Sequence, residues 1–141
     1  MATNVSKITI NAPAEKVWDT ITQPAKVKLW QYGSDLITNW EIGSDIKFVT
    51  EWDGQVFNQW GKVLAYEPVQ LVKYSLFAPR PGLEDKPEHY FEMHYLLAGH
   101  GDHTELTIVQ EDNRPGAVQE PEQGAENPVL KMLKDIAESD S

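Results

Sequence analysis

The sequence contains no cysteine, so a disulfide framework, a thiolate metal site and a cysteine nucleophile are excluded. No apolar run approaches the roughly 20 residues that a membrane-spanning helix needs, and residues 1–7 lack the pattern of a secretory signal. Arginine occurs only at Arg80 and Arg114, and the formal net charge is −10. Because nucleic acids and anionic membranes attract basic surfaces, we expect no binding to nucleic acid and no membrane insertion. The lack of a signal pattern and of a membrane-spanning run leads us to expect a cytoplasmic location.

What the sequence does contain fits one domain over residues 1–141. A chain of this length buries about 68–70% of its unfolded surface, so it needs no disulfide or metal to be stable. No internal repeat and no linker divides it. The excess of acidic residues is interpreted as a source of solubility, with an acidic docking surface as the alternative.

Residues 127–139 predict an amphipathic C-terminal helix. Asn127 is a good N-cap, and Pro128 suits the first helical position because its missing N–H is not needed there. Apolar residues then recur at helical spacing, at Val129, Leu130, Leu133, Ile136 and Ala137. This apolar face is expected to pack on the rest of the chain.

The remainder of the chain reads as a first strand, two short helices and a series of hairpins. Alternation of apolar and polar residues predicts strands over 6–10, 36–40, 45–52, 55–66, 71–77, 88–97 and 104–110. Helices are expected from Pro13 to Thr22 and from Ala25 to Trp30. Asp53-Gly54 predicts a tight hairpin turn, Gly61 a bulge or bend, and residues 112–125 a long loop. The order predicts an α+β fold, with a curved antiparallel sheet of about six or seven strands around a long C-terminal helix.

Several segments in register resemble the AHSA1-like branch (activator of Hsp90 ATPase homologue 1-like) of the START-like, or SRPBCC, superfamily. They are Asn11 to Pro24 with Leu29-Trp30, Ile42 to Ile46, Gly61 to Val63 with Glu67-Pro68, Leu71 and Tyr74-Ser75, Thr104 to Thr107, and Leu130 to Leu133. The resemblance covers nearly the whole chain. It implies the helix-grip (Bet v 1-like) fold, in which a curved sheet and the last helix enclose a hydrophobic cavity. Members often enter that helix through a Gly-Trp pair, whereas that place reads Glu126-Asn127-Pro128-Val129 in this chain. Since no bulky aromatic residue stands at the helix start, we expect a wider pocket mouth.

The candidate pocket residues follow from strand parity and from this resemblance. They are Trp30, Phe48, Trp52, Tyr74 and Tyr95, with Leu130 and Leu133 on the C-terminal helix and Arg80 at the rim. For each aromatic the alternative is core filling, because aromatic side chains dominate protein cores. Asn58, Gln59 and Gln110 are polar strand residues that would orient a ligand if they face the cavity.

The sequence shows no recognisable catalytic constellation. His89 and His94 differ by an odd number on one expected strand, so they face opposite sides and cannot bind one metal together. The parity of that strand favours an outward His94, whereas an inward His94 would be a candidate general acid or base. His100 and His103 flank a turn that is interpreted as a solvated hairpin tip, with a loose metal site as the alternative. We therefore expect no metal and no cofactor.

Three functions remain, in this order. The first is binding of a hydrophobic or aromatic small molecule in the cavity. The second is an enzyme of cyclase or hydrolase type, which needs at least one buried acid or base; Glu51, Glu92 or His94 inside the cavity would favour it. The absence of a catalytic pattern disfavours it. The third is an Hsp90-type chaperone co-factor, which the family name suggests. A homodimer is left open.

Overall fold

The computed structural model describes residues 2–30, 33–52, 54–79, 82, 84–112, 124 and 128–139, apart from the Trp52 side chain. The strands are β1 (Ala2–Ile10), β2 (Asp35–Ile37), β3 (Asp45–Trp52), β4 (Gln55–Glu67), β5 (Leu71–Leu76), β6 (Phe91–Gly99) and β7 (Thr104–Asp112). The helices are α1 (Ala14–Thr22), α2 (Pro24–Trp30) and α3 (Pro128–Glu138), with a short 3₁₀ helix at Pro87–His89.

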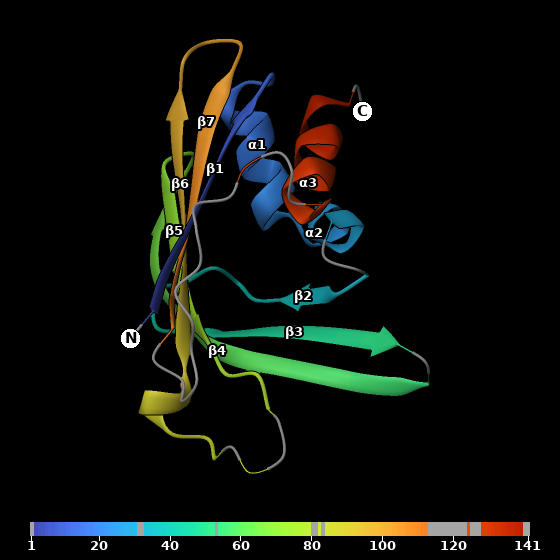
Figure 1. Cartoon of the computed structure of the whole chain (residues 1–141), viewed down its shortest axis with the longest axis vertical. Helices are drawn as coiled ribbons and strands as arrows, with labels where there is room; N and C mark the ends of the chain where they lie inside the picture. The colour runs from blue at the N-terminus through green and yellow to red at the C-terminus, as the bar shows by residue number, and fades with distance from the viewer. Residues whose placement is uncertain are drawn as a thin grey trace.

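The strands form one antiparallel sheet in the order β1-β7-β6-β5-β4-β3-β2. Figure 1 shows the three helices on one face of this sheet, with the long β3–β4 hairpin turning away from β5–β7 and passing beneath α2. The predicted α+β helix-grip fold, with a curved antiparallel sheet and a C-terminal helix, is confirmed.

The sheet bends where β4 passes from β3 to β5. Gly61 is required there because a Cβ atom on it would lie 1.8 Å from the carbonyl oxygen of Ser75. The pairing with β5 shifts register between Val63 and Ala65, which is a bulge and increases the local twist. The expected irregularity at Gly61 is therefore a close backbone approach, and the bulge itself follows it.

The core lies between the concave face of the sheet and the helices. On α3, Leu130, Leu133 and Ala137 are buried at i, i+3 and i+7, and the helix packs against α1, α2 and β1. Full burial of a leucine side chain contributes about 1.5–3 kcal/mol. The apolar stripe that the sequence predicts is thus the face that holds α3 on the molecule.

Polar contacts fasten the last turn of α3 to the segment between β1 and α1. The Glu138 carboxylate accepts hydrogen bonds from the backbone N–H of Asn11 at 2.8 Å and from the Lys134 ammonium. The Lys16 ammonium donates to the carbonyl oxygen of Ser139. Although burial acts to raise the pKa of Glu138, these donors outweigh it, and the pKa of that carboxyl is lowered.

Some predicted boundaries were wrong. The expected strand over 88–97 begins only at Phe91, because Pro87–His89 forms a 3₁₀ turn in which the Tyr90 amide bonds the Pro87 carbonyl. The expected strand over 36–40 ends at Ile37, where the Thr38 hydroxyl accepts a hydrogen bond from the Trp40 amide at 3.1 Å. The predicted cap at Asn127, the Asp53 turn position and residues 113–123 and 125 of the expected loop lie outside the described residues.

Candidate functional site

Two adjoining pockets lie between the concave face of the sheet and the first turn of α3. Their volumes are about 280 and 360 Å³, and both are lined by Trp30, Met93, Tyr95 and Val129. The smaller pocket reaches towards β1 and β7, and the larger one towards β3, β4 and β5. Because they share four lining residues, we treat them as two halves of one inner site.

Trp30 is held at the junction of the two halves. It is the last residue of α2, and its indole N–H donates to the carbonyl oxygen of Thr20 at 2.7 Å. Its ring centroid lies 6.4 Å from that of Tyr95, in a tilted arrangement. A buried indole needs such a hydrogen-bond partner, and this one fixes the ring as a rigid wall of the site.

A pair of buried tyrosine hydroxyls lies at the sheet side of the site. The hydroxyl of Tyr74 on β5 donates to that of Tyr95 on β6 at 3.3 Å. Burial, the charge of Tyr95 and its hydrogen bond raise the pKa of Tyr74 well above 10.0. Burial also raises the pKa of Tyr95. Both hydroxyls therefore stay neutral at ordinary pH and act as hydrogen-bonding groups.

Further polar side chains line each half of the site. Gln110 on β7 pairs with Met93 and lines the smaller half, together with Asn4 and Ser6 of β1. Gln59 on β4 pairs with Phe48 and lines the larger half, where the hydroxyls of Ser34 and Thr50 share a hydrogen bond of 2.6 Å. The described lining of both halves carries neither a charged side chain nor a histidine.

The predicted pocket residues fall into three groups. Trp30, Tyr74, Tyr95 and Leu130 line the inner site. Phe48 and Leu133 are buried in the core at 5% and 0% exposure and line neither half. The Trp52 side chain and Arg80 lie outside the described residues.

Other aromatics bear out the core-filling alternative. Tyr66 stacks on Trp40 with ring centroids 5.6 Å apart and packs against Trp18 at 5.3 Å. None of these three rings lines the inner site. Strand parity cannot sort these rings, because Trp18 and Trp30 lie on helices and Trp40 lies between two strands.

Sequence reasoning missed part of the lining and left part of it open. It did not select Met93, Ile108 or Phe91, whose place follows from the register of β6 against β7. It left Gln59 and Gln110 open, and both line the site. Asn58 pairs with Val49 on the outer face instead. Val129, in the first turn of α3, lines both halves.

The candidate acid–base residues lie on the other face of the sheet. Glu92 and His94 alternate with the inward Phe91, Met93 and Tyr95 on β6, so they point outward, as parity predicts for His94. Glu51 pairs with Val56 on the outer side of the β3–β4 hairpin. These three residues therefore supply no acid or base to the inner site.

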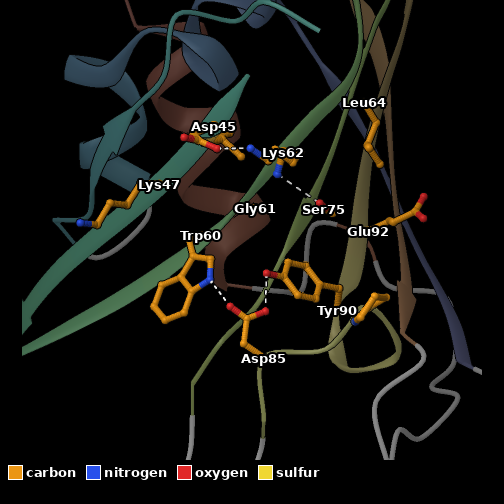
Figure 2. A pocket seen from close by; sticks show the side chains of 12 residues that line it. Asp45, Lys47, Trp60, Gly61, Lys62, Leu64, Ser75, Asp85, Tyr90 and Glu92 are labelled. Atoms are coloured by element: carbon orange, nitrogen blue, oxygen red, sulfur yellow. Dashed lines mark hydrogen bonds and ion pairs between the residues drawn. The ribbon is translucent and has the colours of Figure 1, made fainter. Parts of the chain in front are cut away.

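The outer face carries a groove of about 680 Å³, shown in Figure 2. The Asp85 carboxylate accepts hydrogen bonds from the Trp60 indole at 3.0 Å and from the Tyr90 hydroxyl at 2.6 Å. Burial and the bond to Asp85 raise the pKa of Tyr90 to about 12. Lys62 pairs with Asp45 on the opposite side of the groove.

Solved structures of other proteins have a similar fold. A crystal structure of a Chromobacterium violaceum protein is 23% identical, with 98% of each chain covered and a TM-score of 0.76. A solution structure from Cytophaga hutchinsonii is 29% identical over 82% of this chain and 80% of that one, with a TM-score of 0.69. The solution structure of an Aha1 dimer from Colwellia psychrerythraea is 18% identical over 83% and 81%, with a TM-score of 0.60.

Two further comparisons complete the assignment. The search of curated proteins gives no match. In the part of the chain that the structure describes, no helix has the length and apolar character needed to cross a membrane. The family described as activator of Hsp90 ATPase homolog 1-like protein matches residues 11–138. With its helix-grip fold, the chain therefore belongs to the activator of Hsp90 ATPase homolog 1-like family.

Proposed function

We propose that the protein is a cytoplasmic binder of a small hydrophobic or aromatic molecule, held between the curved sheet and α3. One observation carries the proposal: two pockets of about 280 and 360 Å³ adjoin through Trp30, Met93, Tyr95 and Val129. Ligand sites are typically concave and mainly apolar, with a few placed polar groups. The inner site has this character.

The polar groups of the inner site favour an uncharged ligand with a hydrogen-bond acceptor. The Tyr74 hydroxyl donates its hydrogen bond to the Tyr95 hydroxyl. The Tyr95 hydroxyl is the acceptor in that bond, so its own hydrogen is not engaged there. Since no lysine or arginine is among the described lining residues, an anionic ligand would find no counter-charge there. A flat molecule with one carbonyl or ether oxygen fits these conditions.

The test uses a matched pair of tryptophan variants on α3. Val129 lines both halves of the site, whereas Met132 is 44% exposed on another face of the same helix. The Val129→Trp variant fills the mouth, and Met132→Trp adds the same side chain outside the site. Binding is measured by titration with N-phenylnaphthylamine, an uncharged fluorescent probe, after circular dichroism has shown that both variants fold.

We expect saturable binding by the wild type and by Met132→Trp, and at least about a tenfold loss in Val129→Trp, because the added ring removes the volume that the probe occupies. Equal affinity of all three proteins would contradict the proposal, as would the absence of saturable binding by the wild type. Native mass spectrometry of the protein purified from its own host then looks for a co-purifying molecule.

A further inference from the structure

Three side chains converge on the outer face of the sheet, away from the inner site. They are Glu92 and His94 of β6 and Glu111 of β7, and their ligand atoms all lie within 4.8 Å of one another. The His94 side chain is the most buried of the three, at 13% exposure, against 42% and 37% for the glutamates. We propose that Glu92, His94 and Glu111 form a binding site for a divalent transition-metal ion, with Zn²⁺ as the fitting case.

The distances suit a shared ion. His94 Nε2 lies 3.1 Å from a carboxylate oxygen of Glu92 and 4.0 Å from one of Glu111. Zinc bonds of about 2.0–2.1 Å to nitrogen and oxygen, arranged tetrahedrally, place neighbouring ligand atoms about 3.3 Å apart. The His94–Glu92 pair already has nearly this spacing, and a small rotation of the Glu111 side chain brings the third oxygen in.

The sheet register explains why a cation belongs there. Glu92 and Glu111 stand directly opposite each other in the β6–β7 pair, and like charges in that relationship are destabilising. Lys73 is the nearest cation by register, since it pairs with His94, but it forms none of the ion pairs found among the described residues. A divalent ion would bind both carboxylates and the imidazole at once.

The ligand set selects the kind of metal. An imidazole combined with carboxylates suits zinc and the neighbouring first-row ions, whereas Mg²⁺ and Ca²⁺ favour oxygen ligands alone. Glu92 also lines the outer groove, and Figure 2 shows it at the edge of that groove. Water or an oxygen donor in the groove would thus complete the coordination of the ion.

The test is calorimetric titration of the untagged protein, residues 1–141, with ZnCl₂ in a non-chelating buffer. The ligand variants are His94→Asn and Glu111→Gln. Glu105→Gln is the matched control, since Glu105 lies on β7 with the same outward parity as Glu111 but outside the cluster. The double variant His100→Gln/His103→Gln removes the stacked histidines near the β6–β7 turn and controls for zinc that is bound there instead of at the proposed site.

We expect one Zn²⁺ per chain in the wild type, in Glu105→Gln and in the double histidine variant. Since loss of a mere supporting partner costs 10–100-fold in metal affinity, loss of a ligand in His94→Asn or Glu111→Gln should cost at least about tenfold. Excess Mg²⁺ should not displace the zinc. No saturable binding by the wild type, undiminished binding by His94→Asn, or loss in the double histidine variant would each overturn the site.

A second measurement, thermal unfolding with and without zinc, separates loss of the zinc site from a general loss of stability in a variant. Zinc should raise the unfolding temperature of the wild type, because a ligand that binds the folded state stabilises it. The shift is taken relative to each variant without metal, so its absence in Glu111→Gln supports the site whatever the starting stability. An equal shift in wild type and Glu111→Gln would rule Glu111 out as a ligand.

Discussion

Tyr74 and Tyr95 meet hydroxyl to hydroxyl across 3.3 Å, with Tyr74 as the donor and both rings buried. The pair joins β5 to β6 on the face that lines the inner site. The two residues have different roles, because Tyr74 donates this hydrogen bond and Tyr95 accepts it. Tyr95 is the acceptor on which the buried Tyr74 hydroxyl depends.

Removing the acceptor should therefore cost more than removing the donor. We expect Tyr95→Phe to lower the free energy of unfolding by about 2 kcal/mol, since it leaves a buried donor without a partner, and Tyr74→Phe by about 1 kcal/mol. Urea denaturation of both single variants and of the double variant measures the difference and the coupling. Additive effects of the two changes would show that the hydroxyls do not act as a pair.

The same tyrosines should set the response to alkali. The folded-state pKa values of Tyr74 and Tyr95 are raised above the ordinary value of 10.0. Their contribution to stability is therefore complete below pH 10 and is lost as the pH rises above it, because ionisation then favours the unfolded chain. Denaturation at pH values from about 8 to 11 should show a steeper loss in the wild type than in Tyr74→Phe/Tyr95→Phe. Parallel curves for the two proteins would contradict this.

Acid should loosen the last turn of α3. The pKa of Glu138 is lowered from its ordinary value of 4.5, since the bonds from Lys134 and Asn11 outweigh the opposing effect of burial. Its contribution is present above pH 4.5 and is lost as the pH falls through the lower folded-state value. We expect Glu138→Gln to lower the free energy of unfolding by about 1 kcal/mol at neutral pH, after allowance for solvent screening.

The control for that change is Asp135→Asn on the same helix. Asp135 pairs with Lys131, but both side chains are more than 60% exposed, so its removal should have almost no effect. The difference between wild type and Glu138→Gln should shrink as the pH falls below 4.5. A difference that stays constant with pH would show that the lost contact is not electrostatic.

Gly61 should be intolerant of any side chain. A Cβ atom there would lie 1.8 Å from the Ser75 carbonyl oxygen and 2.5 Å from its carbon, so the backbone of β5 would have to move. We expect Gly61→Ala to cost about 3 kcal/mol, the upper end of typical overpacking. In Gly99→Ala the new atom would meet only the Ala14 side chain at 3.1 Å, and we expect a loss below about 1 kcal/mol. Equal stability of the two variants in urea would contradict the close approach.

Much of the fold could be predicted because the periodicity is strong. The stripe through Leu130 and Leu133 predicts α3, and the alternation of Ile46 and Phe48 with Lys47 predicts the inner face of β3. Strand ends are harder, because local turns compete with the ladder. At Pro87, where a 3₁₀ turn replaces the first residues of an expected strand, composition alone does not decide between the two.

The site could be predicted only in part. Strand parity tells which face of the sheet a side chain occupies, but not whether it lies in the packed core or at the wall of the pocket. Phe48 and Tyr74 both point inward with ring centroids 5.7 Å apart, yet only Tyr74 lines a pocket. The metal-site proposal rests on register, which places Glu111 opposite Glu92 although 19 positions separate them in the sequence. A sequence read without that pairing shows only isolated carboxylates on solvated faces.

The inner site and the outer groove are two sides of the same strands. On β4, Gln59 lines the inner site and the next residue, Trp60, lines the groove. On β5, Tyr74 lines the inner site and Ser75 lines the groove. Only the backbone of these strands therefore separates the inner site from the outer groove. A shift of β4 or β5 that widens the inner site must also change the shape of the groove. We therefore expect the fluorescence of Trp60, which lies in the outer groove, to change when a ligand binds in the inner site.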